Sequence, residues 1–231
     1  MAEFLLKLSF FPLALTLLSY QVGVFVNKKW KSVLTTPLLI AALISIAVLL
    51  GTKYPADAYQ NAMNSSVQWL LTPATVCLAV PLYRQVKVLK KSLPGILAGV
   101  VAGTVTAMGS VFGLCKLFDL SRQVAIPMLT KSVTTAIGLA LTEQNGGVAA
   151  LAPVGTFLTG MTGCLMGLML CKLLKIKEPE AQGAAFGTAA HVIGTSKISE
   201  VGQLQAAVGT LSLTVSGVLT AILFPIIVNW L

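Results

Sequence analysis

Eight mostly apolar stretches follow one another along the chain, and short polar or charged segments separate them. Their limits are residues 4–26, 33–51, 65–84, 95–117, 122–142, 148–171, 183–200 and 204–230. Because an α-helix rises about 1.5 Å per residue, about 20 apolar residues cross a hydrocarbon core about 30 Å thick. The pattern therefore predicts an all-α integral membrane protein, with a single polytopic domain over residues 1–231.

The composition agrees with a chain whose main solvent is lipid. Of its 231 residues, 56% are apolar and 10% are charged, against about 25% charged in a soluble domain, and the mean hydropathy is +0.88. A soluble enzyme or nucleic-acid-binding module is thereby excluded. The four cysteines lie in or beside apolar stretches without metal-ligand spacing, so we expect packed thiols, no metal and no cofactor. The chain lacks the common catalytic motifs, and we expect no enzymatic activity.

Three of the eight stretches are interrupted by proline, by runs of glycine and hydroxyl residues, or by ionisable residues. The interruptions are residues 71–75 with 81–83, residues 130–135, and residues 187–197. Irregular backbone at membrane depth persists only where protein or water satisfies its polar groups. We therefore expect the hydrophilic segments around Thr75, Thr134 and His191 to meet as unwound chain around a small wet chamber.

Basic residues predict the orientation of the stretches. The net charge is +9, and ten basic residues form three clusters: Lys28, Lys29 and Lys31; Arg84, Lys87, Lys90 and Lys91; and Lys172, Lys175 and Lys177. Such clusters mark cytoplasmic loops, which places the N-terminus outside. Three stretches lie between the second and third clusters, so one of them must enter and leave on the same side. The stretch 122–142 has the most polar centre, and we expect it to be re-entrant.

With that segment re-entrant, two groups of three stretches run in opposite directions. The stretches 33–51, 65–84 and 95–117 run antiparallel to 148–171, 183–200 and 204–230, and the middle member of each group is broken. This pattern is typical of an inverted repeat with two discontinuous helices. The predicted repeats cover about residues 1–117 and 122–231.

Lys131 is the sharpest candidate for ligand binding. A lysine near the bilayer centre costs about 2.5–3.5 kcal/mol and needs a partner or a wet cavity. Beside Ser132, Thr134 and Thr135 it would offer an ammonium and several hydroxyl donors to an anion. Alternatively, it lies near a helix end and extends to the interface.

His191, the only histidine, is the second candidate. It could titrate near neutral pH and couple proton movement to transport, or it could be a neutral histidine hydrogen-bonded between packed helices. The backbone amides of Gly187 and Thr188 could complete a carboxylate site, because a half-helix N-terminus favours an anion. Helix packing is the alternative explanation for the glycine.

Four further residues are candidates for coupling or structure. Pro73 and Pro81 remove two backbone donors, which either frees carbonyl groups for a cation or water or only kinks the helix. Lys197 and Glu200 are three residues apart, the spacing at which they can pair with each other on a helix.

The interrupted segments also resemble a known family. Residues 73–83, residues 131–136 with Gly146 and Gly147, and residues 187–200 resemble three ordered blocks of the LrgB/CidB/YohK family of bacterial inner-membrane proteins. The resemblance covers essentially the whole chain. Thr130 and Ala136 depart from it, because many relatives have proline at the first position and some at the second.

The resemblance implies two functions, of which the first is our leading hypothesis and the second the alternative. One is a secondary transporter of a small monocarboxylate, of the pyruvate or glycolate type, that works by alternating access in a fold resembling sodium/proton antiporters. The other is a holin-like or antiholin-like protein that modulates murein hydrolase activity and cell lysis with a small LrgA/CidA-type partner. Both imply a multi-pass protein of the bacterial plasma membrane. We also expect a homodimer, for which the stretch 4–26 could supply a face, and no nucleic-acid partner.

Overall fold

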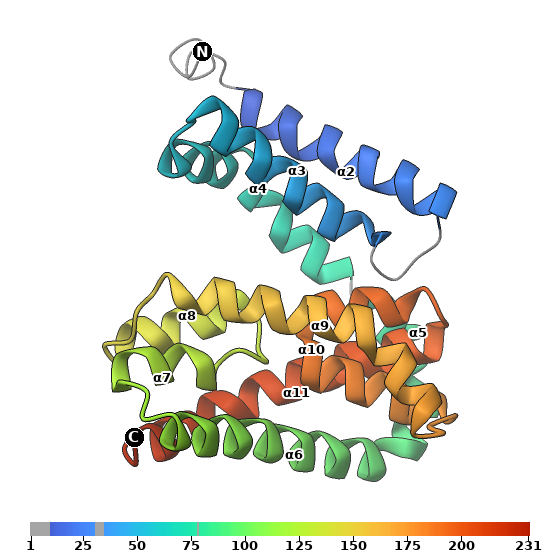
Figure 1. Cartoon of the computed structure of the whole chain (residues 1–231). Coiled ribbons are helices and arrows are strands. Elements are labelled where there is room, and N and C mark those ends of the chain that lie inside the picture. The colour runs from blue at the N-terminus through green and yellow to red at the C-terminus, as the bar shows by residue number, and fades with distance from the viewer. Residues whose placement is uncertain (1–9, 31–34, 78) are drawn as a thin grey trace. The chain divides into compact units, whose positions relative to one another are not determined.

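The computed structural model of the chain describes residues 10–30, 35–77 and 79–231. It divides into two compact units, Met1–Cys77 and Leu78–Leu231, which are described separately (Figure 1). The described residues form α-helices joined by short loops, and no strand occurs among them. The all-α prediction is confirmed for this part of the chain.

The first unit contains α2 (Phe11–Trp30), α3 (Pro37–Thr52) and α4 (Ala56–Cys77). α2 and α3 approach closely at Gly23, where an added Cβ would lie 2.9 Å from the Cα of Pro37. A hydrogen bond between the hydroxyls of Thr16 and Tyr59 joins α2 to α4. Proline suits the first turn of α3, because the N–H that it lacks would have no partner there.

The second unit contains the remaining helices. They are α5 (Ala79–Arg84), α6 (Val86–Leu117), α7 (Arg122–Leu129), α8 (Thr135–Gln144), α9 (Leu151–Leu173), α10 (Pro179–Ser199) and α11 (Gln203–Val228). α10 packs against α9, α11 and α6. α6 begins at Val86 rather than at residue 95, because the lysine-rich segment before the apolar stretch continues the helix.

The stretch 122–142 forms a hairpin of two short helices, α7 and α8, with a break at residues 130–134. The N–H of Val148 donates to the carbonyl of Gln123 at 3.0 Å. The chain segments that enter and leave this hairpin therefore lie side by side, as expected of a segment that returns to its own side.

α10 also reverses direction. Its backbone leaves the helical conformation at Ala190 (φ −126°, ψ 16°) and at His191 (φ 41°, ψ −138°). Ile198, after this point, packs in one cluster with Phe186, before it. A Cβ on Gly194 would come within 3.0 Å of the carbonyl oxygen of Phe186. α10 is therefore a second hairpin, made of two half-helices that fold back on each other.

This second hairpin corrects the predicted course of the chain. We expected the stretch 183–200 to cross the unit. Instead, it returns to the end from which it starts. α6 and α11 consequently run parallel: Leu89 packs near Val208 at one end, and Cys115 packs near Val228 at the other. The prediction that the stretches 95–117 and 204–230 run in opposite directions is wrong.

The two basic clusters of the second unit lie at one end of it. The start of α6 carries the cluster at residues 84–91, the end of α9 carries the cluster at residues 172–177, and Figure 1 shows these helix ends on the same side of the unit. The opposite end holds the C-terminus, where Lys116 Nζ donates to the carbonyl of Leu231 at 3.0 Å. α7 and α8 enter from that opposite end, whereas α10 enters from the basic end.

Three of the described helices are long and apolar enough to cross a membrane: Leu89–Leu117, Leu151–Leu173 and Gln203–Val228. Pro37–Thr52 is a shorter apolar helix. Large apolar side chains such as Leu158, Leu173 and Ile222 are exposed on the spanning helices, as expected of surfaces that face lipid. The chain is therefore a multi-pass membrane protein.

Candidate functional site

The two hairpins of the second unit point their turns toward each other along α9. A Cβ added to Gly155 of α9 would lie 3.7 Å from Lys131 Cβ, and one added to Gly160 would lie 2.7 Å from Cε1 of His191. Two of the three segments that were expected to meet therefore lie together, in the middle of the second unit.

Lys131 lines two cavities at this meeting point. One is a groove of about 550 Å³ along α9 and the first half of α10, which Ala189 and Ala190 also line. The groove is largely apolar, with the hydroxyls of Thr159 and Thr162 among the polar groups. A cavity of this size with few polar groups is typical of a small-molecule site.

The second cavity is small, and hydroxyl groups form part of its lining. Lys131 and Ser132 line it together with Thr104 of α6 and with Ser216 and Thr220 of α11. The hydroxyl of Thr104 donates to Ser216 Oγ at 3.0 Å, and both side chains are buried. Sequence reasoning missed these three hydroxyls, although the recurrence of hydroxyl residues at positions 212, 216 and 220 of an apolar helix signals a polar face.

The Lys131 ammonium lies near one hydroxyl and no acid. Its Nζ donates to Ser132 Oγ at 3.4 Å, and no carboxylate pairs with it among the residues that the structure describes. The side chain is only half-buried, so a ligand can reach it. Among the described residues of this centre, Lys131 is therefore a cation without an acidic partner.

Thr134 gives the α7–α8 break a defined end. It is the N-cap of α8, where its hydroxyl accepts a hydrogen bond from the N–H of Ile137 at 3.4 Å. The start of α8, which carries partial positive charge, therefore lies beside Lys131 at the turn. Thr135 begins α8 and is exposed.

His191 is buried and held by α9. Its Nε2 lies 2.6 Å from the carbonyl oxygen of Thr156, and because a carbonyl only accepts, Nε2 carries the proton. The side chain is 3% exposed, and its positive φ costs about 1–3 kcal/mol in a residue other than glycine. This geometry fixes the turn of the hairpin against α9.

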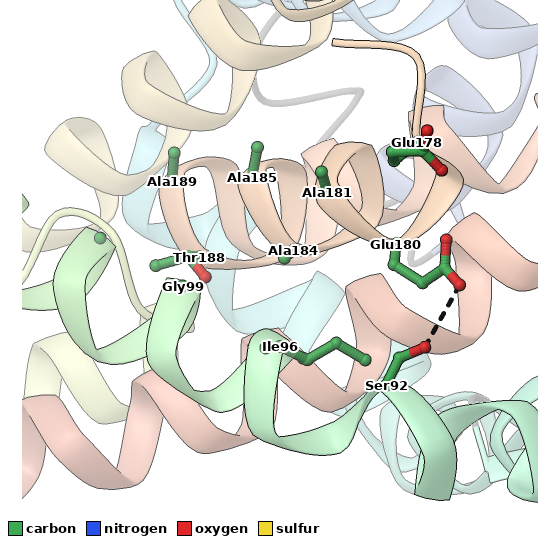
Figure 2. Close-up of a pocket in the computed structure, with 12 residues that line it drawn as sticks. Ser92, Ile96, Gly99, Glu178, Glu180, Ala181, Ala184, Ala185, Thr188 and Ala189 are labelled. Atoms are coloured by element: carbon green, nitrogen blue, oxygen red, sulfur yellow. Dashed lines mark hydrogen bonds between the residues drawn. The ribbon is translucent and has the colours of Figure 1, made fainter.

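Gly187 and Thr188 lie on other faces of α10. A Cβ on Gly187 would collide with the carbonyl of Gly209 of α11, so this glycine allows close helix packing. Thr188 lines a different groove, between α10 and α6 (Figure 2). The structure thus brings Lys131 and Ser132 to the turn of α10, but not to these two residues.

The remaining predicted residues lie in α4, in α5 and at the end of α10. Pro73 lies inside α4, and Thr75 and Pro81 lie in α4 and α5, with the side chains of the latter two outside the described residues. Lys197 and Glu200 form the ion pair that their spacing predicts, with Nζ 2.6 Å from Oε2, at an exposed position. Three of the four cysteines are buried and Cys77 is exposed, all as free thiols.

Comparison with known proteins identifies the family. The model of the LrgB-like family matches residues 16–230. "Antiholin-like protein LrgB" of Bacillus cereus strain B4264 is 32% identical over 217 residues, or 94% of each chain. The protein of the same name from Bacillus anthracis strain CDC 684 / NRRL 3495 gives the same values. No solved structure matches. This chain, with its apolar helices and opposed hairpins, belongs to the LrgB-like family.

Proposed function

We propose that the protein is an antiholin-like protein of the bacterial plasma membrane that restrains cell lysis. The observation that carries the proposal is the similarity to proteins named antiholin-like, which extends over 94% of both chains. The relation includes the second unit with both hairpins, because the family match extends to residue 230. A small LrgA/CidA-type membrane protein would be its partner.

Lysis measurements test this role. In a bacterial strain that lacks its own LrgB-type protein, expression of this chain should slow detergent-induced autolysis and lower the murein hydrolase activity of the culture. The strain carrying the empty vector and a strain expressing an unrelated multi-pass protein are the controls. Equal autolysis in all three strains would contradict the proposal.

A second candidate function rests on the meeting point of the hairpins. We propose that Lys131, the start of α8 and Ser132 bind the carboxylate of a small monocarboxylate during secondary transport. Intramembrane charges are costly and usually serve a pathway. Helix termini that meet near the middle of a membrane protein are a common way to bind solutes in transporters.

The helix directions also favour a transporter. A spanning helix followed by a hairpin occurs twice in the second unit: α6 is followed by the α7–α8 hairpin, and α9 is followed by the α10 hairpin. α6 and α9 run in opposite directions. We infer an inverted pair with these boundaries, of the general kind found in antiporter-type folds. With the basic end of the second unit in the cytoplasm, the α7–α8 hairpin would open outward and α10 inward.

Uptake by proteoliposomes tests the transport function. Radiolabelled pyruvate or glycolate should enter with saturation, and Lys131→Met should reduce uptake at least tenfold. Lys177→Met, which removes an exposed lysine, is the matched control and should leave uptake unchanged. Entry of large dyes without saturation by any carboxylate would instead indicate a membrane lesion and would contradict transport.

A further inference from the structure

The groove between α6 and α10 is the largest described cavity that the proposed functions leave without a role. Its volume is about 750 Å³, and Figure 2 shows it between the two helices. Gly95, Gly99 and Gly103 of α6 line it at intervals of four residues. A Cβ added to Gly95 or Gly99 would meet nothing within 4 Å. The groove therefore leaves helix backbone uncovered, in a helix that can cross a membrane.

A buried hydroxyl in this groove has no partner among the residues that the structure describes. Thr188 is 4% exposed, and its Oγ1 makes no hydrogen bond to any described group. Threonines elsewhere in the helices, such as Thr156 and Thr210, donate to the carbonyl four residues earlier. Figure 2 shows the Thr188 oxygen on the side of α10 that faces α6. An unpaired buried hydroxyl costs about 1–3 kcal/mol, which indicates that something else supplies its partner.

Opposite charges flank the groove at one end. Glu178 and Glu180 line its mouth, and Ser92 donates to Glu180 at 3.3 Å. Neither carboxylate has an ion pair among the described residues. Lys87 and Lys91 continue the four-residue stripe of α6 from Gly95 toward the same end and are exposed. One surface thus carries both an acidic pair and a basic pair, beside a glycine stripe.

We propose that this surface binds a second copy of the chain. Small residues every four positions allow two membrane helices to pack with their backbones close together. Both copies insert in the same orientation, so a two-fold axis perpendicular to the membrane brings Lys87 and Lys91 of one copy to the level of Glu178 and Glu180 of the other. A self-complementary surface of this kind is what a two-fold dimer requires.

The same arrangement supplies the missing partner of Thr188. Glycine leaves the backbone carbonyl of its own helix uncovered. Within one copy the Thr188 Oγ1 is covered, so its side chain must change rotamer before the hydroxyl can donate to such a carbonyl on the second copy. Hydrogen bonds of this kind between membrane helices are common for serine and threonine. The inference goes beyond the proposed functions, because it does not depend on the solute or on lysis control.

Cysteine cross-linking in membranes tests the surface directly. In the full-length chain with its four native cysteines replaced by alanine, Gly99→Cys should form a covalent dimer under mild oxidation. Val101→Cys lies two residues away, on the other side of α6, and is also exposed; it should give no cross-link. A Gly99→Cys protein that stays monomeric, or that links only to another protein, would overturn the proposal.

Steric and charge variants provide a second test in detergent, by native mass spectrometry. Gly99→Leu has open space in one copy, so it should remain folded and shift the mass from two chains to one, whereas Val101→Leu should leave the dimer intact.

Reversal of both glutamates to lysine should abolish the dimer, and so should reversal of Lys87 and Lys91 to glutamate. A mixture of these two reversed chains should restore a mixed dimer, because both contacts of the two-fold interface regain opposite charges. If folded reversed chains do not associate with each other, the proposed surface is wrong.

Discussion

The two hairpins of the second unit reverse the chain in different ways. Between α7 and α8, residues 130–134 form a wide turn whose lysine is half-buried and has no acidic partner among the described residues. In α10, two residues make the reversal, and His191 is buried, hydrogen-bonded to Thr156 and pressed against Gly160. The α7–α8 turn therefore leaves the ammonium of Lys131 without an acidic partner, whereas the α10 turn uses the ring of His191 in a hydrogen bond to α9.

This difference separates a binding role from a structural role. A residue that binds solute should be replaceable without loss of stability, because it makes few contacts in the protein itself. A residue that shapes the turn should affect stability first. Changes that remove the Lys131 charge and changes that displace His191 should therefore have opposite effects on stability.

The largest effect is expected for Gly160→Leu in α9. An added Cβ would lie 2.8 Å from Nε2 of His191 and 2.8 Å from Cβ of Ile193, so the α10 hairpin would have to move away. We expect a loss of stability of about 3 kcal/mol, measured as a lower thermal midpoint by fluorescence-detected size exclusion. Gly113→Leu, where a Cβ meets nothing within 4 Å, is the control. Equal midpoints for both variants would show that the α10 turn does not depend on this contact.

A smaller effect of opposite sign is expected for Lys131→Met. The substitution removes a half-buried charge without an acidic partner, so it should stabilise the protein by about 1 kcal/mol while the proposed carboxylate binding is lost. The thermal midpoints of the variant and of the unmodified protein are measured with and without pyruvate. Pyruvate should raise the midpoint of the unmodified protein only. A destabilised variant that still responds to pyruvate would assign a structural role to Lys131.

At His191, the glycine variant should be more stable than the alanine variant, which is the reverse of the usual order in a helix. In an ordinary helix interior, glycine is about 1 kcal/mol less stable than alanine. At a φ of 41° the alanine variant keeps the strained Cβ, whereas the glycine variant is free of it. His191→Gly should therefore melt higher than His191→Ala by about 1 kcal/mol. The usual order would contradict the tight turn that the structure has here.

The smallest effect is expected at the α8 cap. Thr134→Ala removes the acceptor for the N–H of Ile137 and should cost about 0.5–1 kcal/mol. Thr135→Ala, one residue later and exposed, should cost less. A pair of thermal midpoints measures this difference, and equal values would mean that the Thr134 hydroxyl does not support the start of α8.

The sequence predicts much of this arrangement through the cost of polar groups in lipid. The polar residues from Lys131 to Thr135 mark the break between α7 and α8, and the position of His191 among small residues marks the interruption of α10. The pair Lys197 and Glu200 follows from helix periodicity alone. These features depend on local composition, which the sequence contains directly.

The direction of the chain after each break could not be predicted in the same way. Glycine and small residues around His191 permit either a kinked crossing or a reversal, and the choice depends on packing against α9 and α11. For the same reason, Gly187 appeared to offer a free amide, although α11 covers it. The buried hydroxyls of Thr104 and Ser216 were missed because isolated serine and threonine residues are common in apolar helices.

The hydrogen bond between Val148 and Gln123 has a consequence for biosynthesis. Its two residues are 25 positions apart, and at synthesis rates of about 5–20 residues per second the acceptor waits about one to five seconds for its donor. During that time α7 lacks the hydrogen bond that joins the two ends of its hairpin. The entrance of the hairpin is therefore expected to close only once Val148, three residues before α9, has left the ribosome.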